Sequence, residues 1–427
     1  MNIFLKALGC RLNEAELEQW ACAFQTKGHV IVEDSEDADI IILNSCAVTK
    51  DAGKKSRQLL NRLYRQNPEA KLVITGCYAS IEKDQVGEML GVDLIVDNAQ
   101  KDILPTLVME TFAIKTMPLV SMEPGESTMF LRGRHRAFIK VQDGCRYRCT
   151  YCIVTIARGE ERSRSLEDIS KEVNLHDSQG IQEVVLTGVH VGGYGSDLGL
   201  SLYDLVVHLL RETDIPRIRF ASVEPWDLPE HFFSLFENSR VMPHMHLPIQ
   251  SGVDSVLRRM SRRCKTAEFK ALVEHARDVD PRFNITTDLI TGFPGETEEE
   301  WRQTVDFVES VGFGHMHVFS FSPREGTKAA KLENVVAPDV KKQRTKEMIA
   351  LAEKMKAQFY RDQMNTHSQV LWERAKKDEQ GNTLYQGYTH NYLKIQTVSE
   401  RPLENIIVDT HLSSYDKEQQ LMLGSIV

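Results

Sequence analysis

The sequence lacks any apolar run near the roughly 18 residues that a membrane-spanning helix needs. Its first residues, Met1–Glu16, also lack the charged segment and apolar stretch of a secretory signal. We therefore expect a soluble cytoplasmic protein without a membrane partner. Eight cysteines in a reducing compartment indicate metal ligands, catalytic groups or packing rather than disulfides.

The chain also lacks an excess of positive charge, since its net charge is −9. Basic residues are nevertheless concentrated locally: Leu131–Ser165 holds nine basic and three acidic residues, a local charge of +6. Lys54–Arg65 and Val256–Thr266 are two further basic blocks. One such block alone is compatible with a solvated face, but three in an acidic chain favour a polyanion-binding surface.

The N-terminal part alternates between apolar runs and helical patterns. The runs are Ile3–Leu8, Asp39–Leu43 and Lys71–Thr75, and the helices are expected over Glu14–Thr26 and Lys54–Gln66. Such β/α alternation predicts an open parallel α/β domain, which we expect to span residues 1–120.

Cysteine follows each of these three runs, at Cys10, Cys46 and Cys77. Parallel strands end at one edge of a sheet, which is where open α/β sheets bind ligands. We therefore expect the three thiols to form one site. The alternative is three buried packing cysteines.

A second β/α series follows the Gly- and Pro-containing segment Ser121–Arg132, which we interpret as a linker. Six strands are expected, near residues 137–141, 183–187, 217–222, 244–249, 284–290 and 315–319. A closed barrel of this type needs about eight β/α units, so six predict an open, partial (β/α)6 barrel over residues 131–365.

The chain ends in a module of different character. A long helix is expected over Lys341–Gln363, and beyond His367 short β-type runs are separated by polar turns such as Gln380–Asn382. We expect residues 366–427 to form a small all-β, five-stranded barrel. Its own charge is −2, from six basic and eight acidic residues, which does not favour RNA binding by the module alone.

The sharpest motif is C-x3-C-x2-C, formed by Cys145, Cys149 and Cys152 directly after the first barrel strand. Three thiolates can hold three irons of a [4Fe–4S] cluster and leave the fourth without a protein ligand. A structural zinc site would need four ligands, and no fourth Cys or His follows at the usual spacing.

This motif resembles that of the radical S-adenosylmethionine (SAM) superfamily, and the partial barrel matches the core fold of that superfamily. The resemblance implies that the open iron chelates SAM and that one electron cleaves SAM into methionine and a 5′-deoxyadenosyl radical. It also implies an electron donor such as a flavodoxin or ferredoxin. The residues expected to contact SAM are Tyr151, Thr187, Gly188, Glu224, Gln250 and Asp288.

The domain arrangement resembles that of the methylthiotransferase family. It places a second cysteine trio on an α/β domain ahead of the radical domain and ends in a small β module of the TRAM type. The resemblance covers essentially the whole chain. It implies two [4Fe–4S] clusters that face one cavity, with the first domain capping the open face of the barrel. One SAM molecule would then methylate a sulfur carried by the N-terminal cluster, and a second would supply the radical.

Three branches of that family act on isopentenyladenosine in tRNA, on threonylcarbamoyladenosine in tRNA, and on an aspartate of a ribosomal protein. The segments Leu8–Asn13 and Asn44–Thr49 resemble the second branch, which typically has a basic residue after the first cysteine. Gln142–Cys145 and Ala157–Gly159 resemble it too, whereas Leu17 departs from the usual acidic residue or serine. We therefore expect the chain to be a methylthiotransferase that acts on threonylcarbamoyladenosine at position 37 of a tRNA anticodon stem-loop.

Basic residues near the second motif are expected to contact that RNA, which has to present a splayed base. They are Arg132, Arg134, Arg136, Arg158, Arg162 and Arg164. Two other classes stay open: a non-catalytic RNA-binding protein with structural clusters, and a radical methylase with an inert first domain. Cys22 and Cys264 lack a partner at ligand spacing and are expected at packing or surface positions.

Overall fold

The computed structural model describes residues 1–114, 135–378 and 380–427. The expected linker Ser121–Arg132 and two expected RNA contacts, Arg132 and Arg134, lie outside the described residues. None of the described helices is both long enough and apolar enough to cross a membrane.

The N-terminal domain is built on a parallel five-stranded sheet with the order β2-β1-β3-β4-β5. Its strands are β1 (Asn2–Ala7), β2 (Val30–Val32), β3 (Ile40–Ser45), β4 (Lys71–Gly76) and β5 (Val92–Val96). Its helices are α1 (Arg11–Thr26), α2 (Lys50–Gln66), α3 (Cys77–Ile81), α4 (Lys83–Gly87) and α5 (Leu104–Thr111). Helices α1 and α5 cover one face, while α2 covers the other. The expected α/β domain is confirmed.

Six parallel strands form the partial barrel. They are β6 (Arg136–Lys140), β9 (Glu183–Thr187), β10 (Arg217–Phe220), β11 (His244–His246), β12 (Asn284–Thr291) and β13 (His315–Ser320). They make two three-stranded sheets, which parallel bridges between Ile218 and Val241 and between Ser222 and His246 join. The expected open (β/α)6 arrangement is confirmed.

Helices pack around these strands, and several begin with a side-chain cap. The helices are α6 (Val154–Arg158), α7 (Leu166–Ser178), α8 (Leu202–Glu212), α9 (Asp254–Arg259), α10 (Thr266–Val279) and α11 (Glu298–Val311). Ser201 and Thr297 form capping boxes at the starts of α8 and α11. A small ribbon of β7 (Gln142–Asp143) and β8 (Arg162–Ser163) lies at the end of β6.

Helix α12 (Pro338–Asp362) packs along β13 and leads into the C-terminal module. The module is a closed five-stranded barrel, as expected. Its strands are β14 (Thr366–Lys377), β15 (Thr383–Thr389), β16 (Lys394–Val398), β17 (Ile406–Asp416) and β18 (Leu421–Ile426). It adjoins the starting ends of the barrel strands: Arg217 Nη2 donates to the Gln369 carbonyl at 2.9 Å, and Asn284 Nδ2 to the Asn391 carbonyl at 2.8 Å.

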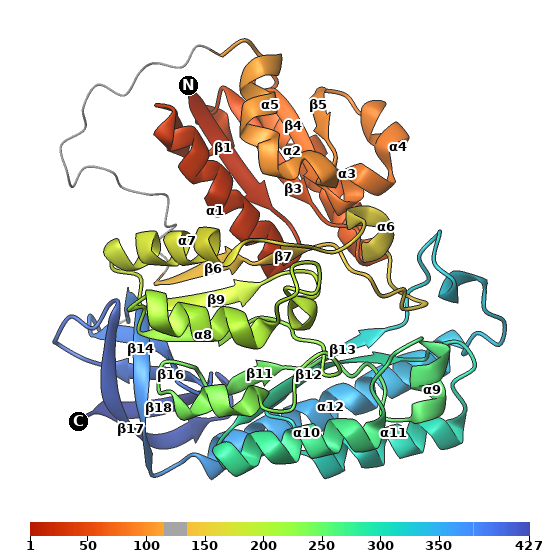
Figure 1. Cartoon of the computed structure of the whole chain (residues 1–427), viewed down its shortest axis with the longest axis vertical. Helices are drawn as coiled ribbons and strands as arrows, with labels where there is room; N and C mark the ends of the chain where they lie inside the picture. The colour runs from red at the N-terminus through yellow and green to blue at the C-terminus, as the bar shows by residue number, and fades with distance from the viewer. Residues whose placement is uncertain (115–134, 379) are drawn as a thin grey trace.

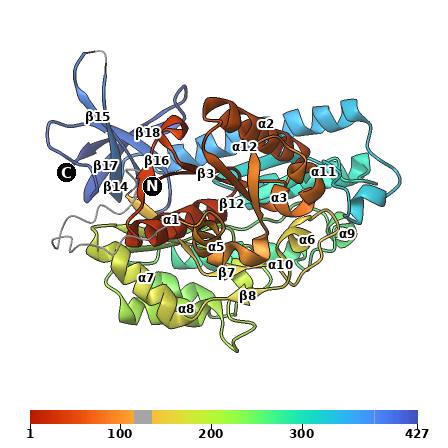
Figure 2. The ribbon, with the colours of Figure 1, turned by 90° about the horizontal axis from the view of Figure 1, so that it is seen from above.

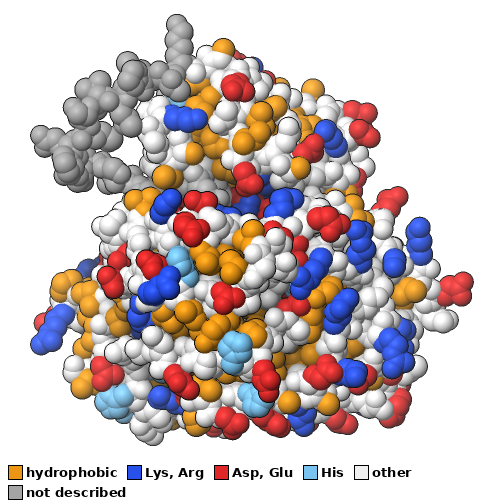
Figure 3. Space-filling model, viewed as in Figure 1, with side chains coloured by type: hydrophobic (Ala, Val, Ile, Leu, Met, Phe, Trp, Pro, Cys, Tyr) orange, Lys and Arg blue, Asp and Glu red, His pale blue; other side chains and the backbone are white. Residues whose placement is uncertain are grey.

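The N-terminal domain lies over the barrel, whereas the module lies at one side (Figures 1 and 2). Helix α1 packs on the barrel edge strand β6, and α3 packs against α6. Charged side chains gather at the waist between domain and barrel in Figure 3. The carboxyl ends of the N-terminal strands therefore point toward the carboxyl end of the barrel.

Candidate active site

The barrel motif lies on a tight loop after β7. Gly144 has φ +72°, and a Cβ there would lie 1.9 Å from the Glu160 carbonyl oxygen, so only glycine fits. The Cys145 amide donates to the Gly159 carbonyl at 3.1 Å, and the Cys152 amide to the Cys149 carbonyl at 3.0 Å. These bonds fold the loop so that its three thiols face the same region.

A segment after α9 supports the same loop. The Thr150 amide donates to the Met260 carbonyl at 3.0 Å, and Arg262 Nη1 lies 4.0 Å from the Cys149 sulfur. The Arg262 guanidinium stacks over Trp226 at 4.2 Å from the ring centre. The basic block around Arg262 therefore contributes a charge to the cysteine site rather than only to an outer surface.

Burial controls the protonation of these thiols. Burial raises the pKa of Cys145 to about 12, with a smaller contribution from the nearby Glu224 carboxylate, and raises that of Cys152 to about 11. The Cys145 and Cys152 thiols are therefore costly to ionise alone, whereas iron would stabilise their thiolates.

The N-terminal trio lies at the carboxyl edge of its sheet, as expected. Gly9 has φ +105°, and a Cβ there would lie 2.7 Å from the Cys46 sulfur, so the loop before Cys10 passes directly over Cys46. Cys46 and Cys77 are buried, whereas Cys10 is exposed. The Asn98 amide donates to the Cys77 sulfur at 3.9 Å.

The two trios are brought to the same interdomain region. Helix α3 begins at Cys77, helix α6 begins two residues after Cys152, and the two helices pack on each other. At the end of α6, Arg158 donates to Asn13 Oδ1 at 2.8 Å, and Asn13 accepts a hydrogen bond from Cys10 at 3.7 Å.

Each donor set consists of three cysteines. A structural zinc ion takes four protein ligands, so either trio would leave it one ligand short. Within residues 1–114, 135–378 and 380–427, no three His, Cys, Asp or Glu side chains form a group that could hold one metal ion. Each trio supplies three thiols, which fits a [4Fe–4S] cluster with one open iron.

A cavity of about 720 Å³ opens beside the N-terminal trio and runs along the inside of the barrel. Residues of all three parts of the chain line it, including Cys10, Thr187, Tyr360 and Tyr388. Four histidines of the barrel strands also line it: His244, His246, His315 and His317. Burial lowers the pKa of His315 to about 4, so this side chain is neutral at pH 7.

The charge of this cavity comes from four cations, Arg11, Arg219, Lys356 and Lys394, against one lining carboxylate, Glu14. Two of them already have acid partners: Arg11 pairs with Glu14 at 3.0 Å and Arg219 with Glu183 at 2.9 Å. Among the described residues, Lys356 and Lys394 form no ion pair, although Lys356 Nζ donates to Gln420 Oε1 at 3.0 Å. Burial together with Lys394 lowers the pKa of Lys356.

The expected SAM contacts lie around the barrel site. Thr187 and Gly188 line the cavity at the end of β9. Tyr151 packs against the apolar cluster of Val256, Met260, Phe293, Phe321 and Ala329.

The remaining three expected contacts follow later strands. Burial raises the pKa of Glu224, and Asp288 pairs with His246 at 3.2 Å. Gln250 has φ +77°, a strained conformation for a residue with a side chain and one that concentrates at functional sites.

A buried histidine that the sequence did not single out lies beneath the motif. His190 Nδ1 lies 2.6 Å from Glu161 and its Nε2 2.7 Å from Asp227. Burial disfavours the charged ring, but the bonds to Asp227 and Glu161 outweigh it and raise the pKa of His190 to about 9. The ring packs edge-on against Tyr147 at 4.9 Å. In the sequence, the only feature that could have pointed to His190 is its position two residues after Gly188, at the end of a predicted strand.

The structure corrects one expected RNA contact, Arg158, and gives a second, Arg136, partners within the protein. Arg158 is 3% exposed and pairs with Glu16 at 2.9 Å and with Asp143 at 3.0 Å, so it cannot line an RNA entrance. Arg136 pairs with Glu373 at 2.5 Å and stacks over Tyr388 at 4.6 Å, which ties the barrel to the module, and its side chain is 15% exposed, so a contact with RNA stays a prediction.

Two expected RNA contacts are accessible. The side chain of Arg162 is 48% exposed, and that of Arg164 is 27% exposed while it bonds to Glu172 at 2.6 Å. Both line the groove between the N-terminal domain and the barrel. Cys22 is half-buried on α1 and Cys264 is buried in the barrel core, so packing accounts for Cys264.

Comparison with known proteins identifies the class. Residues 139–308 match the radical SAM superfamily, and residues 2–97 match the uncharacterized protein family UPF0004. The structure of a radical SAM methyltransferase, TsrM from Kitasatospora setae, superposes with a TM-score of 0.56 at 14% identity, over 75% of this chain and 74% of that one. Fold and motif together define a radical SAM enzyme.

Sequence relatives narrow the class. A threonylcarbamoyladenosine tRNA methylthiotransferase of Thermotoga maritima is 34% identical over 409 residues, which cover 94% of this chain and 92% of the relative. A tRNA-2-methylthio-N(6)-dimethylallyladenosine synthase of Oceanobacillus iheyensis is 35% identical over 91% of this chain and 77% of the relative. The chain therefore belongs to the radical SAM methylthiotransferase family, whose cofactors are SAM and two [4Fe–4S] clusters.

Proposed function

We propose that this enzyme converts N6-threonylcarbamoyladenosine at position 37 of tRNA into its 2-methylthio derivative, with SAM as methyl donor and radical source. The observation that carries the proposal is the convergence of two cysteine trios on one interdomain region, through the packing of α3 on α6. A plain radical methylase has no need of the second trio.

In this proposal Cys145, Cys149 and Cys152 hold the radical-forming cluster, and Cys10, Cys46 and Cys77 hold the cluster that carries sulfur. When bound, the first cluster supplies the electron that cleaves SAM into methionine and a 5′-deoxyadenosyl radical. The chain's own residues orient SAM and enclose the site, because the first domain covers the barrel. The residues that bind SAM in this proposal are Tyr151, Thr187, Gly188, Glu224, Gln250 and Asp288. The domains are taken as residues 1–120, 131–365 and 366–427.

The charge of the cavity supports the choice of substrate. A threonylcarbamoyl substituent carries a carboxylate, whereas a dimethylallyl substituent is apolar and uncharged. Lys356 and Lys394 line the cavity without an ion-pair partner among the described residues. Cations that line a cavity favour an anionic substituent, because hydrogen bonds between an ionised donor and a carboxylate are stronger than neutral ones. Dimethylallyladenosine in tRNA and an aspartate of a ribosomal protein are the alternative substrates.

The RNA partner is an anticodon stem-loop whose base 37 turns into the cavity. Arg162 and Arg164 line the groove beside the N-terminal domain, and we propose that they contact phosphates of the RNA. We further propose a cytoplasmic location, where thiolates stay reduced, and a flavodoxin or ferredoxin as electron donor.

The direct test is anaerobic incubation of the reconstituted enzyme with SAM, a reductant and tRNA that carries threonylcarbamoyladenosine, followed by mass spectrometry of the nucleosides. The expected result is replacement of one hydrogen of the modified base by a methylthio group. Parallel reactions use dimethylallyladenosine tRNA and ribosomal protein. A methylthio product on either of those, without one on the threonylcarbamoyl tRNA, would assign the enzyme to another branch.

A further inference from the structure

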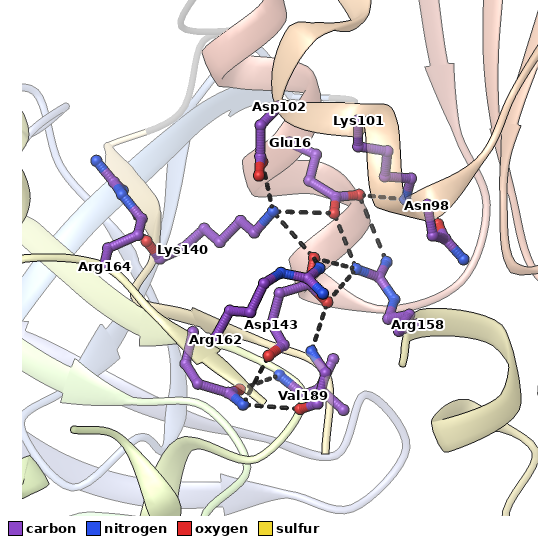
Figure 4. Close-up of polar contacts among 12 residues, drawn as sticks. Glu16, Asn98, Lys101, Asp102, Lys140, Asp143, Arg158, Arg162, Arg164 and Val189 are labelled. Carbon is purple, nitrogen blue, oxygen red and sulfur yellow. Dashed lines mark hydrogen bonds and ion pairs between the residues drawn. The ribbon is translucent and has the colours of Figure 1, made fainter. Parts of the chain in front are cut away.

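Charged side chains are buried in a network between the N-terminal domain and the barrel (Figure 4). Arg158, at the end of α6, pairs with Glu16 of α1 at 2.9 Å and with Asp143 of β7 at 3.0 Å. Lys101 Nζ lies 2.6 Å from Glu16, and both side chains are 1% exposed. Lys140 Nζ lies 3.0 Å from Asp143 and 3.6 Å from Glu16.

The buried members of this network do not balance in charge. Arg158, Lys101 and Lys140 are three cations, while Glu16 and Asp143 are two carboxylates. Burial opposes ionisation of Glu16, but Arg158 and Lys101 outweigh it and hold its pKa well below the usual value, so it is charged at neutral pH.

A further carboxylate, that of Asp102, contacts Lys140 but is 73% exposed, so water screens it. Arg158 and Lys101 share the single carboxylate of Glu16, so positive charge exceeds negative charge around these two side chains. A further anion beside them would be stabilised in this buried setting.

Arg158 and Lys101 contact the loops that carry the N-terminal cysteines. Arg158 Nη2 donates to Asn13 Oδ1 at 2.8 Å, and the Cys10 thiol donates to the same oxygen at 3.7 Å. Lys101 Nζ donates at 3.0 Å to Oδ1 of Asn44, which lies two residues before Cys46 at the end of β3. Asn98 joins the same region, since its amide donates to the Cys77 sulfur at 3.9 Å and to the Ala157 carbonyl at 2.6 Å. Lys140, by contrast, pairs with Asp143 and with the exposed Asp102, each at 3.0 Å.

We propose that Arg158 and Lys101 are positioning residues for the N-terminal cluster: their surplus charge neutralises its thiolates and raises its reduction potential. Adding an electron makes a thiolate-ligated cluster more negative, and a buried cation within range favours that reduced state. The network also joins α1 to α6, so docking of the N-terminal domain completes the environment of its own cluster. This inference rests on the proposed assignment of Cys10, Cys46 and Cys77 to that cluster.

The test is a potentiometric titration of the N-terminal cluster, followed by electron paramagnetic resonance. The full chain is used in a Cys145→Ala/Cys149→Ala/Cys152→Ala background, so that only the N-terminal cluster gives a signal. Lys101→Met removes one buried cation while leaving Glu16 paired with Arg158. We expect its potential to fall by enough to change the ratio of reduced to oxidised cluster about tenfold at a fixed potential, which is ~59 mV for one electron.

Two further variants test whether the direction of the change in reduction potential follows the charge that is removed. Glu16→Gln removes a negative charge and is expected to raise the potential. Lys140→Met removes a cation of the same network that pairs with Asp143 and the exposed Asp102, and it is expected to leave the potential within the titration error. Equal shifts for Lys101→Met and Lys140→Met, or none for either, would overturn the proposal.

Iron counting separates this proposal from the functional one. A parent background without cluster iron would refute the assignment of the N-terminal cysteines. Loss of iron from Lys101→Met alone, with the circular dichroism spectrum unchanged, would support charge neutralisation as a condition for holding the cluster.

Discussion

Alanine in place of Cys10, Cys46 or Cys77 is expected to abolish methylthiolation of tRNA while 5′-deoxyadenosine still forms from SAM. SAM cleavage depends on the barrel trio and the residues around Tyr151, which these changes leave intact. Methylthiolation depends in addition on the N-terminal trio, which carries the sulfur. Cys46 and Cys77 are buried at the end of their sheet, and alanine removes only a sulfur atom from each site. Nucleoside mass spectrometry and quantification of 5′-deoxyadenosine in the same reaction check both halves of the prediction.

The matched control is Cys22→Ala, on the half-buried side of α1. It removes the same atom from the same domain without touching the cysteine edge of the sheet, so both products are expected at wild-type levels. Methylthiolation that survives in all three single variants would mean that the first domain is inert and that the enzyme is a plain radical methylase.

Removing the two lysines of the cavity is expected to weaken selection of the anionic substrate. In Lys356→Met/Lys394→Met the substituent would lose charge-assisted hydrogen bonds, each worth about 1.5–3 kcal/mol. Two such bonds amount to about 3–6 kcal/mol, which corresponds to a loss in kcat/KM for threonylcarbamoyl tRNA of about 100-fold to 10,000-fold. The kcat/KM for dimethylallyl tRNA is expected to stay level or rise, because that substituent makes no such bond.

Lys354→Met is the control for this pair of changes. Lys354 lies on the same helix, α12, but outside the cavity, and its side chain is 74% exposed beside Glu309. Its kinetic constants are expected to match those of the unaltered enzyme with both tRNAs. If the double variant loses activity equally toward both substrates, the lysines serve the RNA backbone or the fold rather than the substituent.

The strand ends and the two cysteine trios were predictable from the sequence because both depend on local pattern. An apolar run that stops at Gly-Cys marks a strand end, and parallel strands bring such ends together. The short strand β2 and the half-buried strand β5 were not predicted, since three residues at a sheet edge and an interrupted apolar run give little signal.

The ion-pair partners and the burial of single charged residues were not predictable in the same way. Arg158 resembles a surface arginine in a basic segment, but its partner Glu16 is 142 residues away in the chain. Likewise Lys356 belongs to the long helix α12, and only the packing of that helix along β13 brings it to the cavity. Pairing across domains depends on tertiary structure, which a local pattern does not contain.

Iron and sulfide analysis of the anaerobically reconstituted protein tests directly whether one chain holds two clusters. We expect about eight irons per chain, because each trio would hold a four-iron cluster. The Cys10→Ala/Cys46→Ala/Cys77→Ala variant is expected to hold about four, all of them at the barrel site. About four irons in the unaltered protein, with no change in that variant, would contradict the sulfur-inserting role of the N-terminal domain.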